Sequence, residues 1–263
     1  MDKAELLERM HVDGEQRLLL ARILDKLEQS ERRGIPTSTD FLSPQERQSA
    51  ETAVRLAGVG PEQALSYGGY ESAERKILLF PPDWMAPEDA VAQAPVCFLR
   101  AEYRGELTHR DFLGSLLGLG IAREKTGDLL VGEGSCDLIV SESVRDFLIQ
   151  NWESAGRVKL TVTAIAPEEL RVPEIRCEEI RDTVQTLRLD AVAAAGFRLS
   201  RAKSAALIES GKVQVNWREC IKSDALLREG DVISARGLGK IKLSQVGGLS
   251  RKGRTGIVIL RYL

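Results

Sequence analysis

The feature that most constrains the fold of this chain is the segment TLRLDAVAAAGFRLSRAKSAALIESGKVQVNW at residues 186–217. Its residues 187–195 favour a short helix that ends at Gly196. A second helix over residues 200–210 begins with a serine, which can act as its N-cap. An alternating strand should follow over residues 212–217. The pattern therefore predicts a compact pair of helices that leads directly into a strand.

Two more strands, rich in Ile and Val, are expected at residues 231–235 and 256–262, which would place the helix pair on a small sheet. In the second helix Ala202, Ala205 and Ile208 recur every three residues and predict a narrow apolar face. The opposite face would hold Arg201, Lys203 and Ser204. This module resembles the S4 RNA-binding domain, which a ribosomal protein, many pseudouridine synthases and some tRNA synthetases share.

The charge of the chain is divided very unevenly. Residues 185–263 hold 15 of the 37 Lys and Arg but 6 of the 39 Asp and Glu, so their formal charge is +9, whereas residues 1–184 carry −11. The overall charge of −2 hides these two opposite fields. Such an asymmetry indicates a polyanionic partner for the basic part of the chain.

Arg201 and Lys203 lie in the first turn of the second helix, where cations oppose the helix macrodipole. A helix N-terminus already offers free N–H groups to anions, so basic side chains there suit a phosphate site. A merely solvated basic face or loop is the alternative. We expect these residues to contact RNA: Arg188, Arg198, Ser200, Arg201, Lys203, Ser204, Lys212, Asn216, Trp217, Arg236, Lys240, Arg251, Lys252 and Arg254.

Two aromatic side chains lie within this basic part. Phe197, in the turn between the helices, is interpreted as a core residue. Trp217 either stacks on an unpaired base or packs against the fold, and it stands where the S4 pattern commonly has Gly.

The remaining composition indicates an ordinary folded intracellular protein. A chain of 263 residues with 43% hydrophobic residues can bury a core of two or three domains. The charged start MDKAELLERM contains neither a signal peptide nor a membrane span, so we expect a cytoplasmic protein, and we expect it to be a monomer. Its four cysteines are widely spaced, at Cys97, Cys136, Cys177 and Cys220, and it has two histidines. We therefore predict no metal site, no disulfide framework and no cofactor.

The N-terminal part, residues 1–88, is predicted to be helical. Apolar residues recur at helical spacing within residues 16–30. Ser43, Pro44 and Glu46 supply an N-cap, a proline at the first helical position and a capping-box glutamate.

Residues 90–166 predict a βαββαβ domain of the RRM-like, ferredoxin-like type, with both helices on one sheet face and the other face available. Helices are expected at 108–119 and 141–155, and strands at 96–103, 128–131, 136–140 and 157–165. The segment CDLIVS lacks the aromatic residues that stack on bases in RNA-recognition motifs, so we do not expect stacking on this sheet. The fold class is thus α+β, with a linker at 167–184 and the S4 domain with its C-terminal strand at 185–263.

Taken together, the chain resembles the YlmH-like S4 family of bacteria, whose cyanobacterial and plastid branch is named photosystem II S4 domain protein. The resemblance rests on GGYESAER, THRDFLGSLLGLGIAREKTGD, the S4 segment, VQVNW, ISARGLGK and SRKGR. It implies an RRM-like middle domain and a C-terminal S4 domain that binds ribosomal RNA or tRNA on the large subunit. It also implies a role in translation quality control and no cofactor.

The second of these motifs offers secondary candidates in His109, Arg110 and Arg123. We interpret His109 as a cap or a polar contact rather than a catalyst, because no nucleophile or orienting carboxylate accompanies it. Our first hypothesis is a non-catalytic RNA-binding factor. The alternatives are an RNA-modifying enzyme of the pseudouridine synthase type, whose catalytic motif resembles RLD at 188–190, and a protein adaptor in photosystem II assembly.

Overall fold

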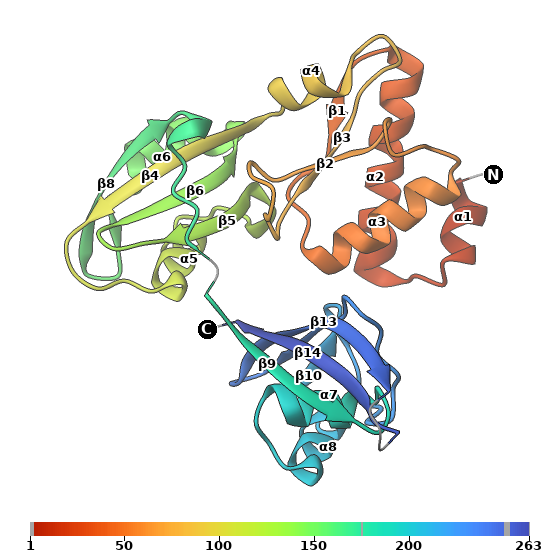
Figure 1. The fold of residues 1–263 in the computed structure, drawn as a ribbon. Coiled ribbons are helices and arrows are strands. Elements are labelled where there is room, and N and C mark those ends of the chain that lie inside the picture. The colour runs from red at the N-terminus through yellow and green to blue at the C-terminus, as the bar shows by residue number, and fades with distance from the viewer. Residues whose placement is uncertain (1–2, 175, 250–252, 263) are drawn as a thin grey trace. The chain divides into compact units, whose positions relative to one another are not determined.

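The structure is a computed structural model that describes residues 3–174, 176–249 and 253–262. It divides into two compact units, residues 1–173 and 174–263. The fold class is α+β, as expected, with three separate sheets (Figure 1). No helix among the described residues is both long enough and apolar enough to cross a membrane.

The N-terminal part of the first unit combines helices with a small sheet of order β1-β3-β2, so it is less purely helical than expected. The predicted capping box is present, because the Ser43 hydroxyl accepts from the Glu46 N–H and the Glu46 carboxylate accepts from the Ser43 N–H. The elements are α1 Lys3–Arg9, α2 Gly14–Arg33, β1 Thr37–Ser38, α3 Pro44–Leu56, β2 Leu65–Tyr67, β3 Ile77–Phe80 and α4 Pro87–Ala92.

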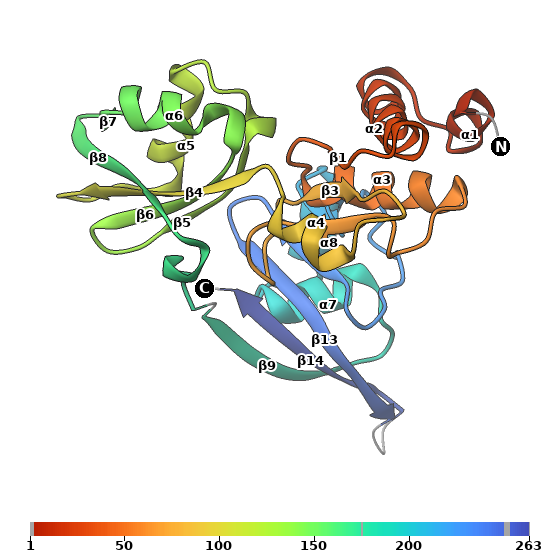
Figure 2. The same cartoon turned by 90° about the horizontal axis from the view of Figure 1, so that it is seen from above.

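The second part of the first unit is built on an antiparallel sheet of order β5-β6-β4-β8-β7. Figure 2 shows α5 and α6 on one side of this sheet, and Phe112, Leu116 and Leu148 from these helices enter its core. The elements are β4 Val96–Tyr103, α5 His109–Gly118, η1 Arg123–Lys125, β5 Thr126–Val131, β6 Ser135–Ser141, α6 Glu142–Asn151, β7 Ser154–Ala155, β8 Val158–Ile165 and η2 Pro167–Glu169.

The other face of this sheet is covered at β5, β6 and the start of β4 and exposed at β8, so the expectation of an available face is only partly met. Phe98 and Ile139 project from it into a second core, which they share with Phe41, Ile77 and Leu79 of the N-terminal part. β6 is buried along almost its whole length, and exposing its second face would cost the hydrophobic free energy of its burial. The N-terminal part therefore occupies part of the surface with which an RNA-recognition motif would bind bases.

A buried ion pair lies on the same face, beside the exposed Glu102, Thr161 and Thr163. Arg100 donates from Nε and Nη2 to the two carboxylate oxygens of Asp137 at 2.7 and 2.8 Å. The chain that follows β8 folds over the pair, because the Arg171 N–H donates to Asp137 and Arg100 also donates to the Glu169 carbonyl. The segment 167–173 thus belongs to the first unit.

The second unit is a six-stranded antiparallel sheet of order β11-β10-β12-β13-β14-β9 with two helices. The expected linker 167–184 differs from the structure, since β9 pairs with β14 along its whole length, from Val184 opposite Thr255 to Cys177 opposite Tyr262. The elements are β9 Cys177–Val184, α7 Leu189–Gly196, α8 Arg201–Glu209, β10 Val213–Val215, β11 Arg218–Glu219, β12 Val232–Ala235, β13 Gly239–Leu249 and β14 Thr255–Tyr262.

Helix α7 packs closely on the sheet at its last residue, Gly196. A Cβ added at Gly196 would overlap the Ile241 side chain of β13. The left-handed residue that terminates α7 is Arg198 instead, with φ 56°. Gly196 is therefore required for close packing more than for ending the helix, although the helix does end there.

Candidate nucleic-acid interface

The second unit contains a groove of about 730 Å³ lined by residues of α7, the end of β9 and the start of β14. Arg198, Arg201 and Arg254 line it, and we call it the arginine groove. Arg198 and Arg201 come from the turn between α7 and α8 and the start of α8, Arg254 comes from the residue before β14, and Asp182 also lines the groove. Three guanidinium groups around one groove form an arrangement suited to phosphate, which guanidinium binds through paired N–H donors.

Arg198 occupies a position where glycine is the usual residue. The Leu199 N–H donates to the Ala194 carbonyl at 2.9 Å, which is the hydrogen bond of a Schellman motif, and Arg198 is the left-handed residue inside it. A non-glycine residue there costs about 1–2 kcal/mol. Its side chain is 62% exposed and forms an ion pair with Glu178 on β9. A strained arginine at the mouth of a groove favours a functional role over a structural one.

Arg201 is held by the carboxylate of the RLD segment at 188–190. Asp190, buried in the first turn of α7, accepts from Arg188 at 3.1 and 3.2 Å and from Arg201 at 3.3 Å to each oxygen. Burial alone would raise the pKa of Asp190, but the two guanidinium groups outweigh it and hold the pKa below its ordinary value. Asp190 thus positions two arginines that remain partly exposed. The RLD segment was an available signal for the Arg188 contact alone.

The other residues of α8 divide into a cap, an exposed cation and a buried hydroxyl. The Ser200 hydroxyl accepts from the Lys203 N–H at 3.3 Å, as its predicted capping position requires. Lys203 is exposed and forms no ion pair with any residue that the structure describes. Ser204 is buried, so its assignment to the RNA-binding face is wrong. Ser204 and Ile208 are one helical turn apart and share the packed face, whereas Ala202 is exposed.

Asn216 and Trp217 form the two-residue turn of the β10–β11 hairpin, so the strand predicted over residues 212–217 ends earlier, at Val215. Both turn residues have positive φ, 48° and 62°, as a type I′ turn requires. The Asn216 side chain donates to Asp231 at 2.8 Å and accepts from the Val232 N–H, so it serves the fold. Trp217 is half-buried, and its positive φ explains why glycine is common at this position.

The remaining candidates of this unit lie outside the groove, with one exception. Arg254 lines it and donates to the Thr183 carbonyl. Lys212 and Arg236 are exposed neighbours, since the Arg236 N–H donates to the Lys212 carbonyl. Lys240 lies over the Tyr262 ring at 4.6 Å. Arg251 and Lys252 fall outside the described residues.

His109, Arg110 and Arg123 lie in the first unit, where Arg123 has a structural task. Its guanidinium donates to the carbonyls of Thr126 and Gly127 at 2.8 and 3.2 Å, and burial followed by the nearby Arg75 lowers its pKa to about 10. Partial desolvation and then the Arg123 charge lower the pKa of His109. His109 and Arg110 are exposed at the start of α5.

The two sequence motifs of the first unit meet at Asp128. Its carboxylate accepts from the Tyr70 hydroxyl at 2.8 Å and from the Glu74 and Arg75 N–H groups at 2.7 and 3.1 Å. GGYESAER and THRDFLGSLLGLGIAREKTGD therefore form one contact between the N-terminal part and the sheet. Among the described residues, no group of three or more His, Cys, Asp and Glu side chains is arranged to hold a metal ion.

Comparison with known proteins gives matches along most of the chain. Three family models match, "YlmH, N-terminal" at residues 15–83, "Putative RNA-binding domain in YlmH" at residues 101–169 and "S4 domain" at residues 187–233. The chain is 35% identical over 224 residues to the ribosome-associated protein quality control protein P2 of Bacillus subtilis (strain 168), a match that covers 85% of this chain and 86% of that protein.

A solved structure shares the fold. Cell division protein ylmH from Streptococcus pneumoniae is 19% identical, with a TM-score of 0.52, over 61% of this chain and 98% of that one. The long match to the Bacillus protein and the succession of the three family models decide the relationship. This chain belongs to the YlmH family of S4-domain RNA-binding proteins.

Proposed function

We propose that this protein is a non-catalytic factor that binds structured RNA through the arginine groove of its S4 domain. The observation that carries the proposal is the convergence of Arg198, Arg201 and Arg254 on one groove. The strained backbone at Arg198 and the net charge of +9 over residues 185–263 support it. Arg188 and Lys203 extend the same basic surface at the starts of the two helices.

The RNA would be ribosomal RNA or tRNA on the large ribosomal subunit. The protein would act in translation quality control. The name of the Bacillus relative supports this assignment. Such a factor would act in the cytoplasm, and we propose that it does so as a monomer. Lys212, Trp217, Arg236 and Lys240 would form a second contact beyond the groove, and Arg251 and Lys252 would add to the Arg254 side. Kinship to the photosystem II S4 branch, and an adaptor role there, rest on the sequence motifs alone.

We infer an RRM-like arrangement for the middle domain, because its element order and its strand order β5-β6-β4-β8 follow the split-βαβ layout. Its sheet would then support the N-terminal part instead of binding bases, since Phe98 and Ile139 are buried beneath that part. Any RNA contact by this domain would use its exposed loops and helix starts, where Arg110 lies.

A pseudouridine synthase would need a reactive aspartate, and the RLD motif does not supply one. The Asp190 carboxylate is buried and accepts hydrogen bonds from two arginines. It lies within an S4 helix and does not line the arginine groove. These contacts support a positioning role over a catalytic one.

The test compares full-length wild type with Arg198→Gln plus Arg254→Gln in co-sedimentation with purified large ribosomal subunits. Arg181→Gln is the matched control, because Arg181 is 79% exposed in the same unit and does not line the groove. We expect the groove variant to lose at least tenfold in affinity and the control to stay within twofold. Equal binding by all three proteins would contradict the proposal, and binding that survives with a ribonuclease-treated lysate would favour a protein adaptor.

A further inference from the structure

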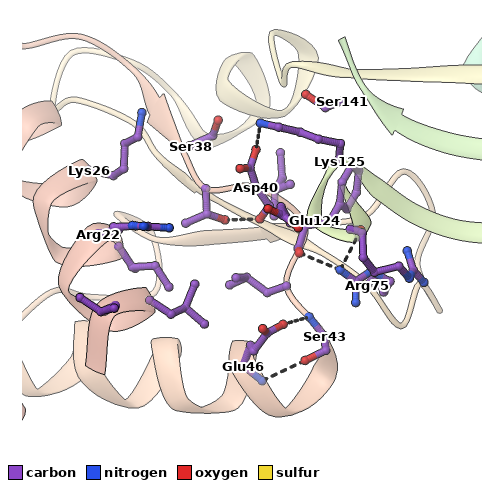
Figure 3. Close-up of a pocket in the computed structure, with 18 of the residues that line it drawn as sticks. Arg22, Lys26, Ser38, Asp40, Ser43, Glu46, Arg75, Glu124, Lys125 and Ser141 are labelled. Carbon is purple, nitrogen blue, oxygen red and sulfur yellow. Dashed lines mark hydrogen bonds and ion pairs between the residues drawn. The ribbon is translucent and has the colours of Figure 1, made fainter. Parts of the chain in front are cut away.

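The first unit contains a larger cleft, of about 1190 Å³, between α2, the segment 38–46 and the turn Arg123–Lys125 (Figure 3). Its volume is in the upper range of small-molecule sites. Of the RNA-contact candidates expected from the sequence, Arg123 lines it, and that side chain is committed to backbone carbonyls. The S4-based function therefore leaves this cleft without a role.

The α2 wall of the cleft carries two cations on one helical face. Leu18, Arg22 and Lys26 recur every fourth residue and all line the cleft. Figure 3 shows Arg22 reaching from α2 toward the side of Asp40. Neither Arg22 nor Lys26 has an ion pair within the described ranges, and like charges four residues apart destabilise a helix. Two unpaired cations facing a cleft indicate an anionic ligand.

The opposite wall supplies a third cation and several hydroxyl groups. Lys125 Nζ lies 2.7 Å from an Asp40 carboxylate oxygen, above the cleft in Figure 3. Ser38, Ser141 and Ser143 also line the cleft, and the Ser141 and Ser143 hydroxyls are 3.0 Å apart. Hydroxyl groups beside unpaired cations are the usual partners of phosphate oxygens.

The carboxylates of the cleft are mostly engaged. Asp40 is paired with Lys125, and Glu46 caps α3 by accepting from the Ser43 N–H at 2.7 Å. Burial lowers the pKa of Arg75, and the nearby carboxylates Glu46, Asp128 and Glu124 partly offset this effect. Glu15 is then the carboxylate that faces Arg22 and Lys26 without a partner in the described chain. The cleft keeps a positive balance within the acidic part of the sequence.

We propose that this cleft binds a phosphate-bearing ligand, with Arg22 and Lys26 as the phosphate contacts and the Ser38, Ser141 and Ser143 hydroxyls as hydrogen-bond donors. Leu18, which is 60% exposed at the cleft, offers an apolar surface for a base or sugar. Phosphate of this kind comes from an RNA backbone or from a free nucleotide. The proposal stands apart from the S4 groove, since its residues belong to the other unit.

The experiment uses the full-length chain with Arg198→Gln and Arg201→Gln, so that RNA binding by the S4 groove is suppressed. In that background Arg22→Gln plus Lys26→Gln is compared with Arg32→Gln plus Arg33→Gln, a pair with the same charge change on the same helix but outside the cleft. The probes are adenosine monophosphate and a short single-stranded RNA, titrated by calorimetry and fluorescence anisotropy. Circular dichroism melting verifies that each variant is folded.

We expect the cleft pair to weaken binding of at least one probe tenfold or more and the control pair to change it less than twofold. Loss of adenosine monophosphate binding assigns the cleft to free nucleotides. Loss of RNA binding alone assigns it to an RNA backbone. If both pairs weaken binding equally, or if neither probe binds the parent protein below millimolar concentration, the proposal is overturned. Neither result bears on the S4 groove, which is disabled throughout.

Discussion

Lys203→Ala and Arg201→Ala form a matched pair that separates phosphate contact from folding. Both residues lie in the first turn of α8, where each cation opposes the helix dipole by about 0.3–1 kcal/mol. Lys203 makes no ion pair in the described chain, so its removal should leave the free energy of unfolding unchanged or raise it by up to about 1 kcal/mol.

Arg201 differs because it contacts Asp190. The contacts are long, 3.3 Å to each oxygen, and the Arg201 side chain is 55% exposed, so the pair should stabilise the fold by only about 0–1 kcal/mol. That gain and the dipole penalty nearly cancel. Arg201→Ala should therefore change the free energy of unfolding by less than about 1 kcal/mol in either direction.

RNA affinity provides the second readout. Each lost phosphate contact should reduce the slope of log affinity against log salt by roughly 0.7–0.9. The assay is RNA binding at four or more KCl concentrations, with urea unfolding of the same preparations. If Lys203→Ala kept the wild-type slope and both variants lost more than about 2 kcal/mol of stability, these residues would serve the fold and the phosphate assignment would be refuted.

Four further predictions concern other residues and the separate units. The stability that Asp190 contributes is fully present above its unfolded pKa, about 3.9, and is lost as pH falls through its lowered folded pKa. The advantage of wild type over Asp190→Asn should therefore decrease progressively in urea titrations as pH falls below about 4. Trp217→Gly should relieve a left-handed backbone strain of about 1–2 kcal/mol, which would offset the lost packing, and should weaken RNA binding only if the ring stacks on a base; unchanged affinity would assign Trp217 to the fold. Residues 1–173 should bind single-stranded RNA more weakly than residues 174–263 near physiological salt, as anisotropy titration can test. Mass spectrometry should find no new pseudouridine in RNA that has been incubated with the full chain.

Sequence reasoning succeeded where local rules decide the structure. The helix pair of the S4 domain follows from Ser200 and the short apolar stretches, and the start of α3 follows from Ser43 and Glu46. The exposed and buried faces of α8 were less well predicted, because Ala202 and Ser204 are both small and composition alone does not decide which of them packs. The contact of Arg201 with Asp190 lay beyond local rules, since eleven residues separate them.

The covered sheet face and the strand β9 were missed for reasons of long-range packing. β6 is buried along almost its whole length, and its continuous apolar run, with Leu138, Ile139 and Val140, was an available signal of burial on both faces. β9 gives no such signal, because CEEIRDTV is rich in charged residues. Its pairing with β14 cannot be inferred from either strand alone.

That pairing also has a kinetic consequence. β9 is the first strand of its sheet along the chain and β14 is the last, and β9 pairs with no other strand. Until β14 is synthesised and pairs with β13, β9 has no neighbouring strand with which to form hydrogen bonds. All the other strands of this sheet lie between β9 and β14 in the sequence. Contacts of high sequence separation slow folding, so we expect closure of the β9–β14 edge to be a late step. On a translating ribosome this module would therefore reach its final form only after nearly all of it has been made, and a nascent chain that stops within β14 would carry an S4 domain with an open edge.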